Sequence, residues 1–361
     1  MPPLHLALKS HTIRLPIFIE SKIWSRMTAF ISKNFEQQAI FVIADQNVAA
    51  LYTSQIKNHL RSLPRFKEIL TFPGGERSKS RFQLERLQDM LLQKKAGRDT
   101  VLIAVGGGVT GDLVGFVAAT LHRGVPLIQM PTSLLAQVDS SIGGKVGIDH
   151  PSGKNLLGNF YQPAAVFIDP EFLKTLPDDE FINGMAEVIK YGIILSPPLL
   201  RRLEIEQKKI LDKQPLTLKT IVKQCVELKL KVVQRDEKES HYRSILNFGH
   251  TAGHAIEQLS RYRLKHGFAV AAGMKISLKL SEQLFGYPES QVKRIFTLLK
   301  NYQLERLDLH QFPFERVWEL ILSDKKVRQQ SPRFTLLDHR QKTVLFHPVT
   351  KKEFRDAWNA M

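Results

Sequence analysis

The chain has 361 residues, of which 43% are hydrophobic and 24% charged, so it is large enough for two domains with a buried core. No apolar run is long enough to cross a membrane, and the first residues lack the apolar block of a secretory signal, which argues against membrane and secreted classes. Cys225 is the only cysteine, which excludes an intrachain disulfide and favours the cytoplasm. The net charge of +17 fits nucleic acid, an anionic surface or anionic metabolites, and we favour a generally basic protein with a pocket for a negatively charged substrate.

The first half of the chain alternates short apolar runs with helical patterns. We predict strands at residues 39–44, 100–105, 125–130 and 165–169, with amphipathic helices at 82–95 and 111–121. This alternation is typical of a Rossmann-like, doubly wound α/β domain, which we place at residues 1–175.

After residue 176, apolar residues recur every three or four positions. This period predicts an all-α domain at 176–361, with helices at 180–194, 217–233, 251–260, 270–285 and 291–302. We expect the active site in the cleft between the two domains, at the carboxyl ends of the strands.

A glycine-rich turn follows the predicted strand at 100–105. Residues 106–111 fit the G-x-G-x-x-G pattern, which lets a helix N-terminus approach a pyrophosphate. The acidic residue expected about 20 positions later is missing, because Asp139 is the first carboxylate after Asp112. Asp45, which closes an earlier strand, is a better candidate for a ribose hydroxyl. The polar loop 73–79 either completes this pocket or forms an ordinary turn before a capped helix.

Lysines and a carboxylate lie in glycine-rich or apolar surroundings. Lys145 and Lys154 stand beside glycines and are candidates for binding phosphate or carboxylate, the alternative being two solvated loop lysines. Glu187 and Lys190 share one helix face. They form either a surface ion pair or, if buried, a metal ligand and a substrate contact.

Three histidines fall within 17 residues, at His250, His254 and His266. Two imidazoles and one carboxylate form a common catalytic zinc arrangement. The four-residue spacing favours a pair of His250 and His254, because i and i+4 face the same way, but the residues leave open which pair binds.

Together these segments resemble the 3-dehydroquinate synthase family, the NAD-dependent cyclases of the shikimate pathway. The resemblance runs from residue 103 to 195 and from 229 to 274. Its motifs are GGGVTGD at 106–112, PTSLLAQVDSSIGGK at 131–145, GKNLLG at 153–158, GMAEVIK at 184–190, LNFGHTAGH at 246–254, and His266-Gly267.

The resemblance implies a site for each ligand. Zn2+ or Co2+ would be held by Glu187, His250 and His266, which leaves His254 a catalytic role. The other catalytic and substrate positions would be Lys145, Lys190, Lys229, Asn155, Asp139, Arg123, Glu239, Arg243, Asn247 and one of two adjacent lysines, Lys325 and Lys326. Of these two lysines we predict Lys326. The NAD+ site would be lined by Asp45, Gly74, Gly75, Glu76, Arg77, Ser78, Lys79, Gly108, Val109, Thr110, Gly111, Asp112, Thr132, Ser133, Lys145, Lys154, Phe172 and Thr175.

By the same resemblance, the chain would be a lyase that converts 3-deoxy-D-arabino-heptulosonate 7-phosphate to 3-dehydroquinate and phosphate with catalytic NAD+. It would act as a homodimer on a small anionic sugar-acid phosphate, without a nucleic-acid or membrane partner. The alternatives are another sugar phosphate cyclase, a metal-dependent polyol dehydrogenase that releases NADH, and a nucleic-acid-binding protein suggested by the charge of +17.

The chain departs from the family at three positions. Ser133 replaces a threonine and keeps the hydroxyl, and His241 stands where a glycine is usual. Phe268 replaces the glutamate of the family's HGE motif, which predicts weaker support for the metal ligand His266.

Overall fold

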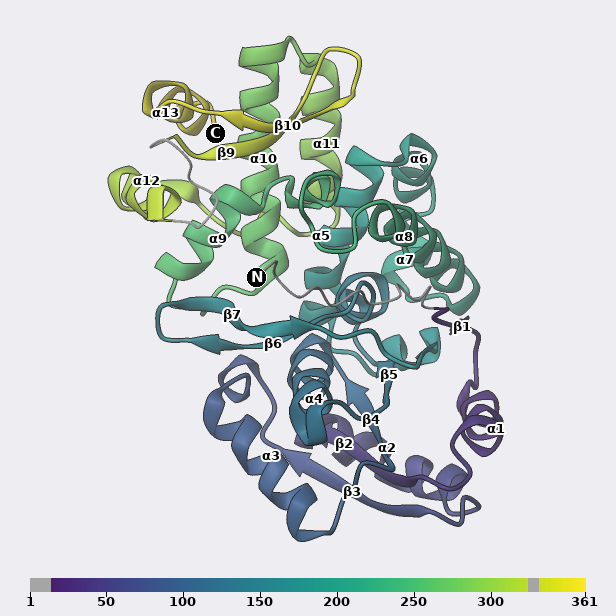
Figure 1. The fold of residues 1–361 in the computed structure, drawn as a ribbon. Helices are drawn as coiled ribbons and strands as arrows, with labels where there is room; N and C mark the ends of the chain where they lie inside the picture. The colour runs from purple at the N-terminus through teal and green to yellow at the C-terminus, as the bar shows by residue number, and fades with distance from the viewer. Residues whose placement is uncertain (1–13, 324–330) are drawn as a thin grey trace, which may run out of the picture.

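The computed structural model describes residues 14–323 and 331–361, which form a sheet-containing part and a helical part (Figure 1). A six-stranded sheet with the order β1-β8-β5-β4-β2-β3 is the centre of the first part, and its recorded pairings are parallel. Its strands are β1 (Ile17–Ile19), β2 (Ala39–Asp45), β3 (Phe66–Phe72), β4 (Thr100–Gly106), β5 (Leu127–Pro131) and β8 (Ala165–Ile168). The four predicted strands are confirmed. The sequence missed β1, which is only three residues long, and β3, in which Lys67 and Glu68 interrupt the apolar run.

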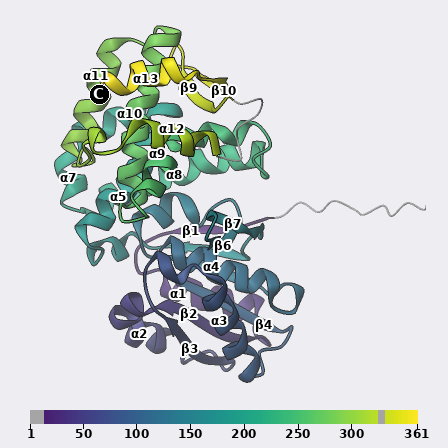
Figure 2. The ribbon, with the colours of Figure 1, turned by 90° about the vertical axis from the view of Figure 1, so that its left-hand side faces the viewer.

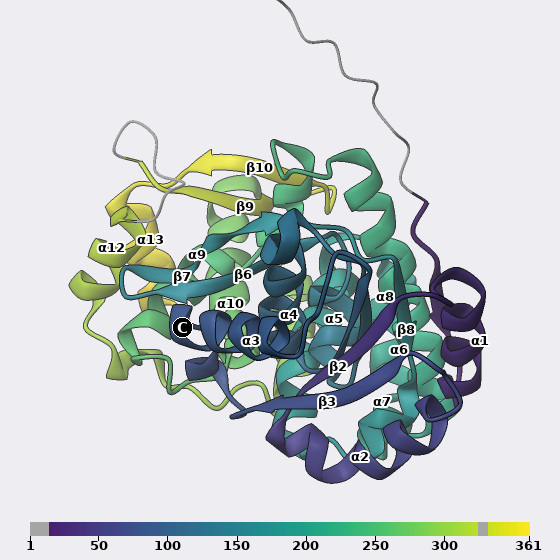
Figure 3. The same ribbon diagram turned by 60° about the horizontal axis from the view of Figure 1, so that its bottom comes forward.

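Helices cover both faces of this sheet, with β2 and β3 side by side at one end of it (Figure 3). On β2, Ile40 and Val42 pack in the core beneath α1 (Trp24–Asn34) and α2 (Gln46–Leu60). Phe41 and Ile43 alternate with them and pack in the core beneath α3 (Arg81–Gln93) and α4 (Gly108–Thr120). Because both faces are buried, the strands read as continuous apolar runs.

The strand order places a topological switch point between β2 and β4. The chain moves from β2 to β3 on one side and then returns to β4 on the other side of β2. In open α/β sheets, ligands bind at such a point, outside the carboxyl ends of the strands. The segments that follow β2, β3, β4, β5 and β8 therefore meet along one edge of the sheet.

A two-stranded antiparallel hairpin, β6 (Lys145–His150) and β7 (Gly153–Phe160), packs on α4 and lies between the two parts (Figures 1 and 2). No strand was predicted from the sequence for this segment, which contains Lys145 and Lys154. Gly147 and Gly158 pair across the hairpin, where a Cβ atom at Gly147 would lie 2.5 Å from the carbonyl oxygen of Leu157. The glycines therefore serve strand pairing as well as ligand approach.

The second part is mainly helical, as predicted, but not all-α. Its helices are α5 (Asp178–Ile194), α6 (Pro197–Ile205), α7 (Gln207–Leu211), α8 (Pro215–Arg235), α9 (His250–Leu259), α10 (His266–Phe285), α11 (Glu289–Asn301), α12 (Phe314–Ser323) and α13 (Lys351–Asn359). A hairpin of β9 (Arg333–Leu337) and β10 (Thr343–Pro348) corrects the all-α prediction. It forms because Phe334 and Leu336 pack into a core with Phe354 and Trp358. Among the described helices, none is both long and apolar enough to cross a bilayer.

Close backbone packing brings α9 and α10 together. A Cβ atom at Gly273 on α10 would lie 1.9 Å from the carbonyl oxygen of Gly249, the N-cap of α9. Gly249 itself has a φ of +79°, a conformation that favours glycine. The two helices that begin with His250 and His266 are thereby held in contact along their length.

We predict that Gly273→Ala lowers the free energy of unfolding by about 2 kcal/mol, because the added methyl group forces the two backbones apart. Urea denaturation measures the loss. Gln283→Ala, on an exposed position of the same helix, should change stability by less than about 0.5 kcal/mol. Equal stability of the two variants would contradict the packing argument.

Candidate active site

Glu187 lies at the centre of the helical part of the site. It is fully buried on α5, and neither carboxylate oxygen accepts a well-oriented hydrogen bond from the described residues. The ammonium group of Lys190, one turn later and also buried, contacts Oε2. Burial raises the pKa of Glu187, but Lys190 and His266 together outweigh it and hold this pKa below its usual range. The side chain is therefore an anion with open lone pairs, as a cation ligand requires.

Two histidines face this carboxylate from the first residues of two helices. His250 Nε2 lies 3.5 Å and His266 Nε2 3.6 Å from Glu187 Oε1. One ligand atom from each of the three residues lies within 4.8 Å of the others, so the donors fit a catalytic zinc site with an open position. Burial and Lys190 lower the pKa of His250 well below its usual value, which keeps the ring neutral, as a metal ligand must be.

His254 lies at the exposed edge of this cluster, with its ring centroid 5.2 Å from that of His250 and 5.9 Å from that of His266. The spacing argument placed His250 and His254 on one face, and they share it. The group that includes Glu187, however, contains His250 and His266. His254 belongs to a second possible group, with Glu257 and His266.

A carboxylate that the sequence analysis missed supports His266. Glu257 Oε2 lies 3.4 Å from His266 Nδ1, and its Oε1 accepts a 2.8 Å hydrogen bond from Lys154. Burial raises the pKa of Glu257, but His266 and Lys154 lower it to about 2. Phe268, by contrast, is buried in the helical core with the Arg306 guanidinium 5.0 Å from its ring. The carboxylate that contacts His266 therefore comes from α9, while the side chain at position 268 is part of the core.

Buried cations surround Asp139, which follows β5. Lys229 Nζ donates to Asp139 Oδ1 at 2.5 Å and to its backbone oxygen at 2.6 Å, and the Tyr191 hydroxyl donates to Oδ1 at 2.7 Å. Burial raises the pKa of Asp139, but Lys229 and Lys190 outweigh it and keep the carboxylate ionised. Burial in turn lowers the pKa of Lys229. These hydrogen bonds hold the charged groups of Asp139 and Lys229 in fixed positions next to each other.

The remaining predicted substrate residues lie on the segment before α9 and on the hairpin. Arg243 is buried and donates to the carbonyl oxygens of Gly143, at 3.2 Å, and Glu237. Glu239 contacts the ammonium group of Lys145 and accepts a 2.8 Å hydrogen bond from Asn247. Asp236, which the sequence analysis missed, fixes this segment by accepting hydrogen bonds from three backbone N–H groups, those of Ser240, His241 and Arg243.

The carboxyl edge of the sheet at the switch point has the donors that a dinucleotide needs. Helix α4 begins at Gly108, and its N-cap Gly107 provides no side-chain hydrogen bond, so the first N–H groups are open to a pyrophosphate. The Thr110 hydroxyl on α4 donates to Asp45 Oδ2, at the end of β2, at 3.1 Å. Asp45 also caps α2 through Oδ1. This arrangement of donors fits NAD+.

The loop after β3 and the hairpin lie beside this edge of the sheet and contact each other. Lys79 is buried, donates to Asp112 Oδ2 at 2.6 Å and contacts the Asn155 amide oxygen. Lys154 donates to Glu76 Oε1 at 2.9 Å as well as to Glu257. The rest of the loop is Gly74, Gly75, Arg77 and Ser78, of which Ser78 is buried and donates to the carbonyl oxygen of Pro73.

Four further NAD+ candidates follow β5 and β8. The backbone N–H of Thr132 donates to the carbonyl oxygen of Gly106, and the Ser133 hydroxyl would lie 3.3 Å from a Cβ atom at Gly107. Phe172 packs edge-on against Tyr52, whose hydroxyl lies 2.5 Å from Thr175 Oγ1. These residues thus line the same edge of the sheet as the glycine turn.

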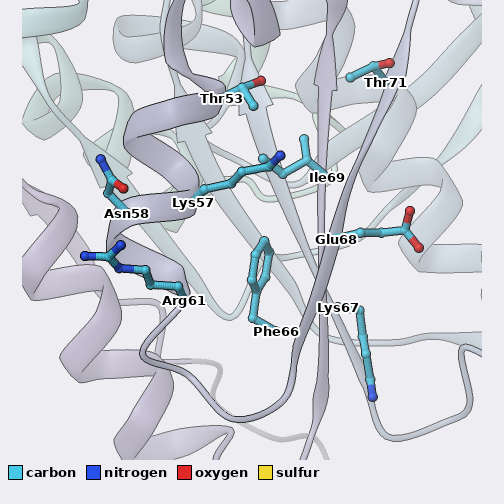
Figure 4. Close-up of a pocket in the computed structure, with 9 residues that line it drawn as sticks. All are labelled: Thr53, Lys57, Asn58, Arg61, Phe66, Lys67, Glu68, Ile69 and Thr71. Atoms are coloured by element: carbon cyan, nitrogen blue, oxygen red, sulfur yellow. The ribbon is translucent and has the colours of Figure 1, made fainter.

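Two predicted residues are not brought to these clusters. Arg123 is exposed after the end of α4, with a φ of +68°, and pairs with no carboxylate among the described residues. Lys326, like Lys325, lies outside the described residues. A surface hollow between α2 and β3 (Figure 4) is lined by Thr53, Lys57, Asn58, Arg61, Phe66, Lys67, Glu68, Ile69 and Thr71, so it shares no residue with the site.

Comparisons with known proteins identify the family of the chain. The family models "3-dehydroquinate synthase N-terminal" and "3-dehydroquinate synthase C-terminal" match residues 69–183 and 184–327. A curated 3-dehydroquinate synthase of Pelobacter propionicus is 46% identical over 300 residues, 82% of each chain.

Two solved structures share the fold. The 2-epi-5-epi-valiolone synthase of Streptomyces hygroscopicus subsp. jinggangensis 5008, solved with NAD+ and Zn2+ bound, is 23% identical, with a TM-score of 0.89 over 99% of both chains. A 2-deoxy-scyllo-inosose synthase complexed with carbaglucose-6-phosphate, NAD+ and Co2+ is 27% identical. Its TM-score is 0.86 over 95% of this chain and 96% of that one. The predicted α/β sheet and helical second part are confirmed.

We predict that Glu187→Gln lowers the affinity for Zn2+ by more than about 100-fold, because the anionic ligand becomes neutral and the effect should exceed that of an outer-shell change. Competition with a chromophoric chelator measures the affinity. Asp178→Asn removes a carboxylate from the exposed first turn of the same helix and should bind Zn2+ like the wild type. Unchanged affinity in Glu187→Gln would exclude this ligand group.

Proposed function

The chain belongs to the 3-dehydroquinate synthase family, and on that premise we propose that it converts 3-deoxy-D-arabino-heptulosonate 7-phosphate to 3-dehydroquinate and phosphate. The observation that carries the proposal is that Glu187, His250 and His266 lie together beside the buried Lys190. Glu257, which contacts His266, is joined through Lys154 to Glu76 in the loop after β3. A lyase of this kind needs a metal ligand group, a dinucleotide site and anion-binding residues in one cleft.

We assign the metal to Glu187, His250 and His266, and NAD+ to the edge of the sheet. When bound, the divalent ion would polarise a substrate hydroxyl and NAD+ would accept a hydride and later return it. The chain's own residues bind and orient the substrate. Lys190, Lys229 and Arg243 are buried cations that suit its carboxylate and phosphate groups. Asp139, held by Lys229 and Tyr191, is a fixed acceptor for a substrate hydroxyl.

We assign proton transfer to His254. Its ring lies at the accessible edge of the cluster, next to the two histidines assigned to the metal. Imidazole is the side chain best suited to donate and accept a proton near neutral pH. Further polar groups near the hairpin are available to the substrate, those of Lys145, Asn155, Glu239 and Asn247.

A homodimer in the cytoplasm is the remaining part of the proposal. The family resemblance supports the dimer, and the single cysteine, which is buried as Cys225, supports a reducing compartment. Light scattering of the purified chain would measure its mass in solution.

We expect phosphate release from the heptulosonate phosphate to require NAD+ and to stop with a metal chelator, because both groups belong to one catalytic site. Added Zn2+ or Co2+ should restore the rate, and absorbance at 340 nm should show no net NADH. Steady NADH formation with glycerol would instead indicate a polyol dehydrogenase. Activity only with another sugar phosphate would indicate a different cyclase.

We expect His254→Ala to lower kcat by about 10²- to 10⁴-fold, the usual contribution of a general acid or base. Its Zn2+ content and its affinity for NAD+ should stay at wild-type values, because the three residues assigned to the metal and the NAD+ residues are unchanged. Gln258→Ala, exposed on the same helix, serves as the control. Full turnover in His254→Ala would remove this residue from the reaction.

A further inference from the structure

Glu257 divides its carboxylate between two parts of the molecule. The side chain is only 2% exposed and projects from α9 one turn after His254. One oxygen, Oε2, faces His266 Nδ1 at 3.4 Å, and the other, Oε1, accepts from Lys154 at 2.8 Å. A buried carboxylate is costly unless such partners compensate it, so both contacts matter to its position.

The contact with His266 decides which ring nitrogen faces the ligand group. An imidazole that donates Nδ1–H to a carboxylate presents Nε2 as its free electron pair. His266 Nε2 points to Glu187, 3.6 Å from Oε1. With a metal bound, the carboxylate of Glu257 would keep the remaining ring proton on Nδ1 and hold Nε2 toward Glu187 and His250.

The contact with Lys154 joins Glu257, and through it His266, to the sheet-containing part of the molecule. Lys154 lies on β7 of the hairpin and pairs with Glu76, in the loop after β3, as well as with Glu257. An ion pair with one partner nearly fully buried is less screened by solvent than a surface pair. A series of contacts, Glu76–Lys154–Glu257–His266, thus connects the loop after β3 with the residues assigned to the metal.

We propose that Glu257 is a positioning residue that holds His266 for metal binding, and that Lys154 acts on the metal through Glu257. The inference rests on the proposed function, since it assumes that His266 binds a metal. A competing arrangement makes Glu257 itself a ligand, together with His254 and His266. The two arrangements predict different effects of the same substitutions.

The test measures Zn2+ affinity by competition with a chromophoric chelator, on NAD-free protein. We expect a loss of about 10-fold for Glu257→Gln and about 100-fold for Glu257→Ala, the range for outer-shell partners of a metal-bound histidine. Glutamine loses the charge but keeps an oxygen that accepts from Nδ1–H, which explains the partial rescue. Glu282→Gln, on the outer side of α10 where Glu282 pairs with Lys279, is the matched control and should retain wild-type affinity.

A double-mutant cycle tests the role of Lys154. Lys154→Met should weaken Zn2+ binding severalfold in the wild-type background and have no further effect in Glu257→Gln, because the pathway is already broken. Equal effects in both backgrounds would overturn the claim that Lys154 acts through Glu257. Thermal unfolding of the metal-free variants separates these changes from a loss of folding.

Two further results would overturn the inference. Wild-type Zn2+ affinity in Glu257→Ala would show that His266 needs no such support. A loss in Glu257→Gln as large as in Glu187→Gln would make Glu257 a ligand. Wild-type protein that binds no Zn2+ would overturn the proposed function and this inference with it, so the two failures are distinguishable.

Discussion

The buried carboxylate of Glu187 is the constraint on which the site depends. An ion removed from water costs several kcal/mol unless nearby charges compensate it. Lys190, from the same helix, supplies one compensating charge, and the ring nitrogens of the two histidines lie close enough to the carboxylate to bind one cation together with it. Their positions follow from the close packing of α9 against α10, because each histidine is the first residue of its helix.

The sheet supplies the other half of the site, again because secondary-structure elements bring distant residues together. Parallel strands place their carboxyl ends along one edge, so residues far apart in the sequence meet there without special contacts. Asp45 and Thr110 illustrate this, since they are 65 residues apart and share a hydrogen bond across the switch point. The β6–β7 hairpin then joins the sheet-containing part to the helical part through Lys154.

The sequence predicts those features that depend on local pattern. The continuous apolar runs of β2 and β4 identify buried parallel strands, and the glycines after β4 identify the turn before α4. The β9–β10 hairpin was not predicted, because its packing partners lie in distant helices. In the site, spacing correctly put His250 and His254 on one helix face. It could not show that His266, from another helix, lies nearer to Glu187.

Glu257 also could not be assigned a role from the sequence, because its spacing from His254 does not identify its partners. It follows His254 by three residues and therefore lies near the same helix face. Only the packing of α9, α10 and the hairpin shows that its partners are His266 and Lys154.

Charge balance explains why this cleft suits an anionic substrate. The buried ammonium groups of Lys79, Lys190 and Lys229 each contact a carboxylate. Arg243 differs, because its recorded hydrogen bonds go to backbone oxygens. A divalent cation at Glu187 would add two positive charges to a cleft whose carboxylates are already paired. An anionic ligand compensates that excess in a poorly solvated site, whereas a neutral polyol does not. The overall charge of +17 favours the approach of such an anion, but these few buried groups determine where it binds.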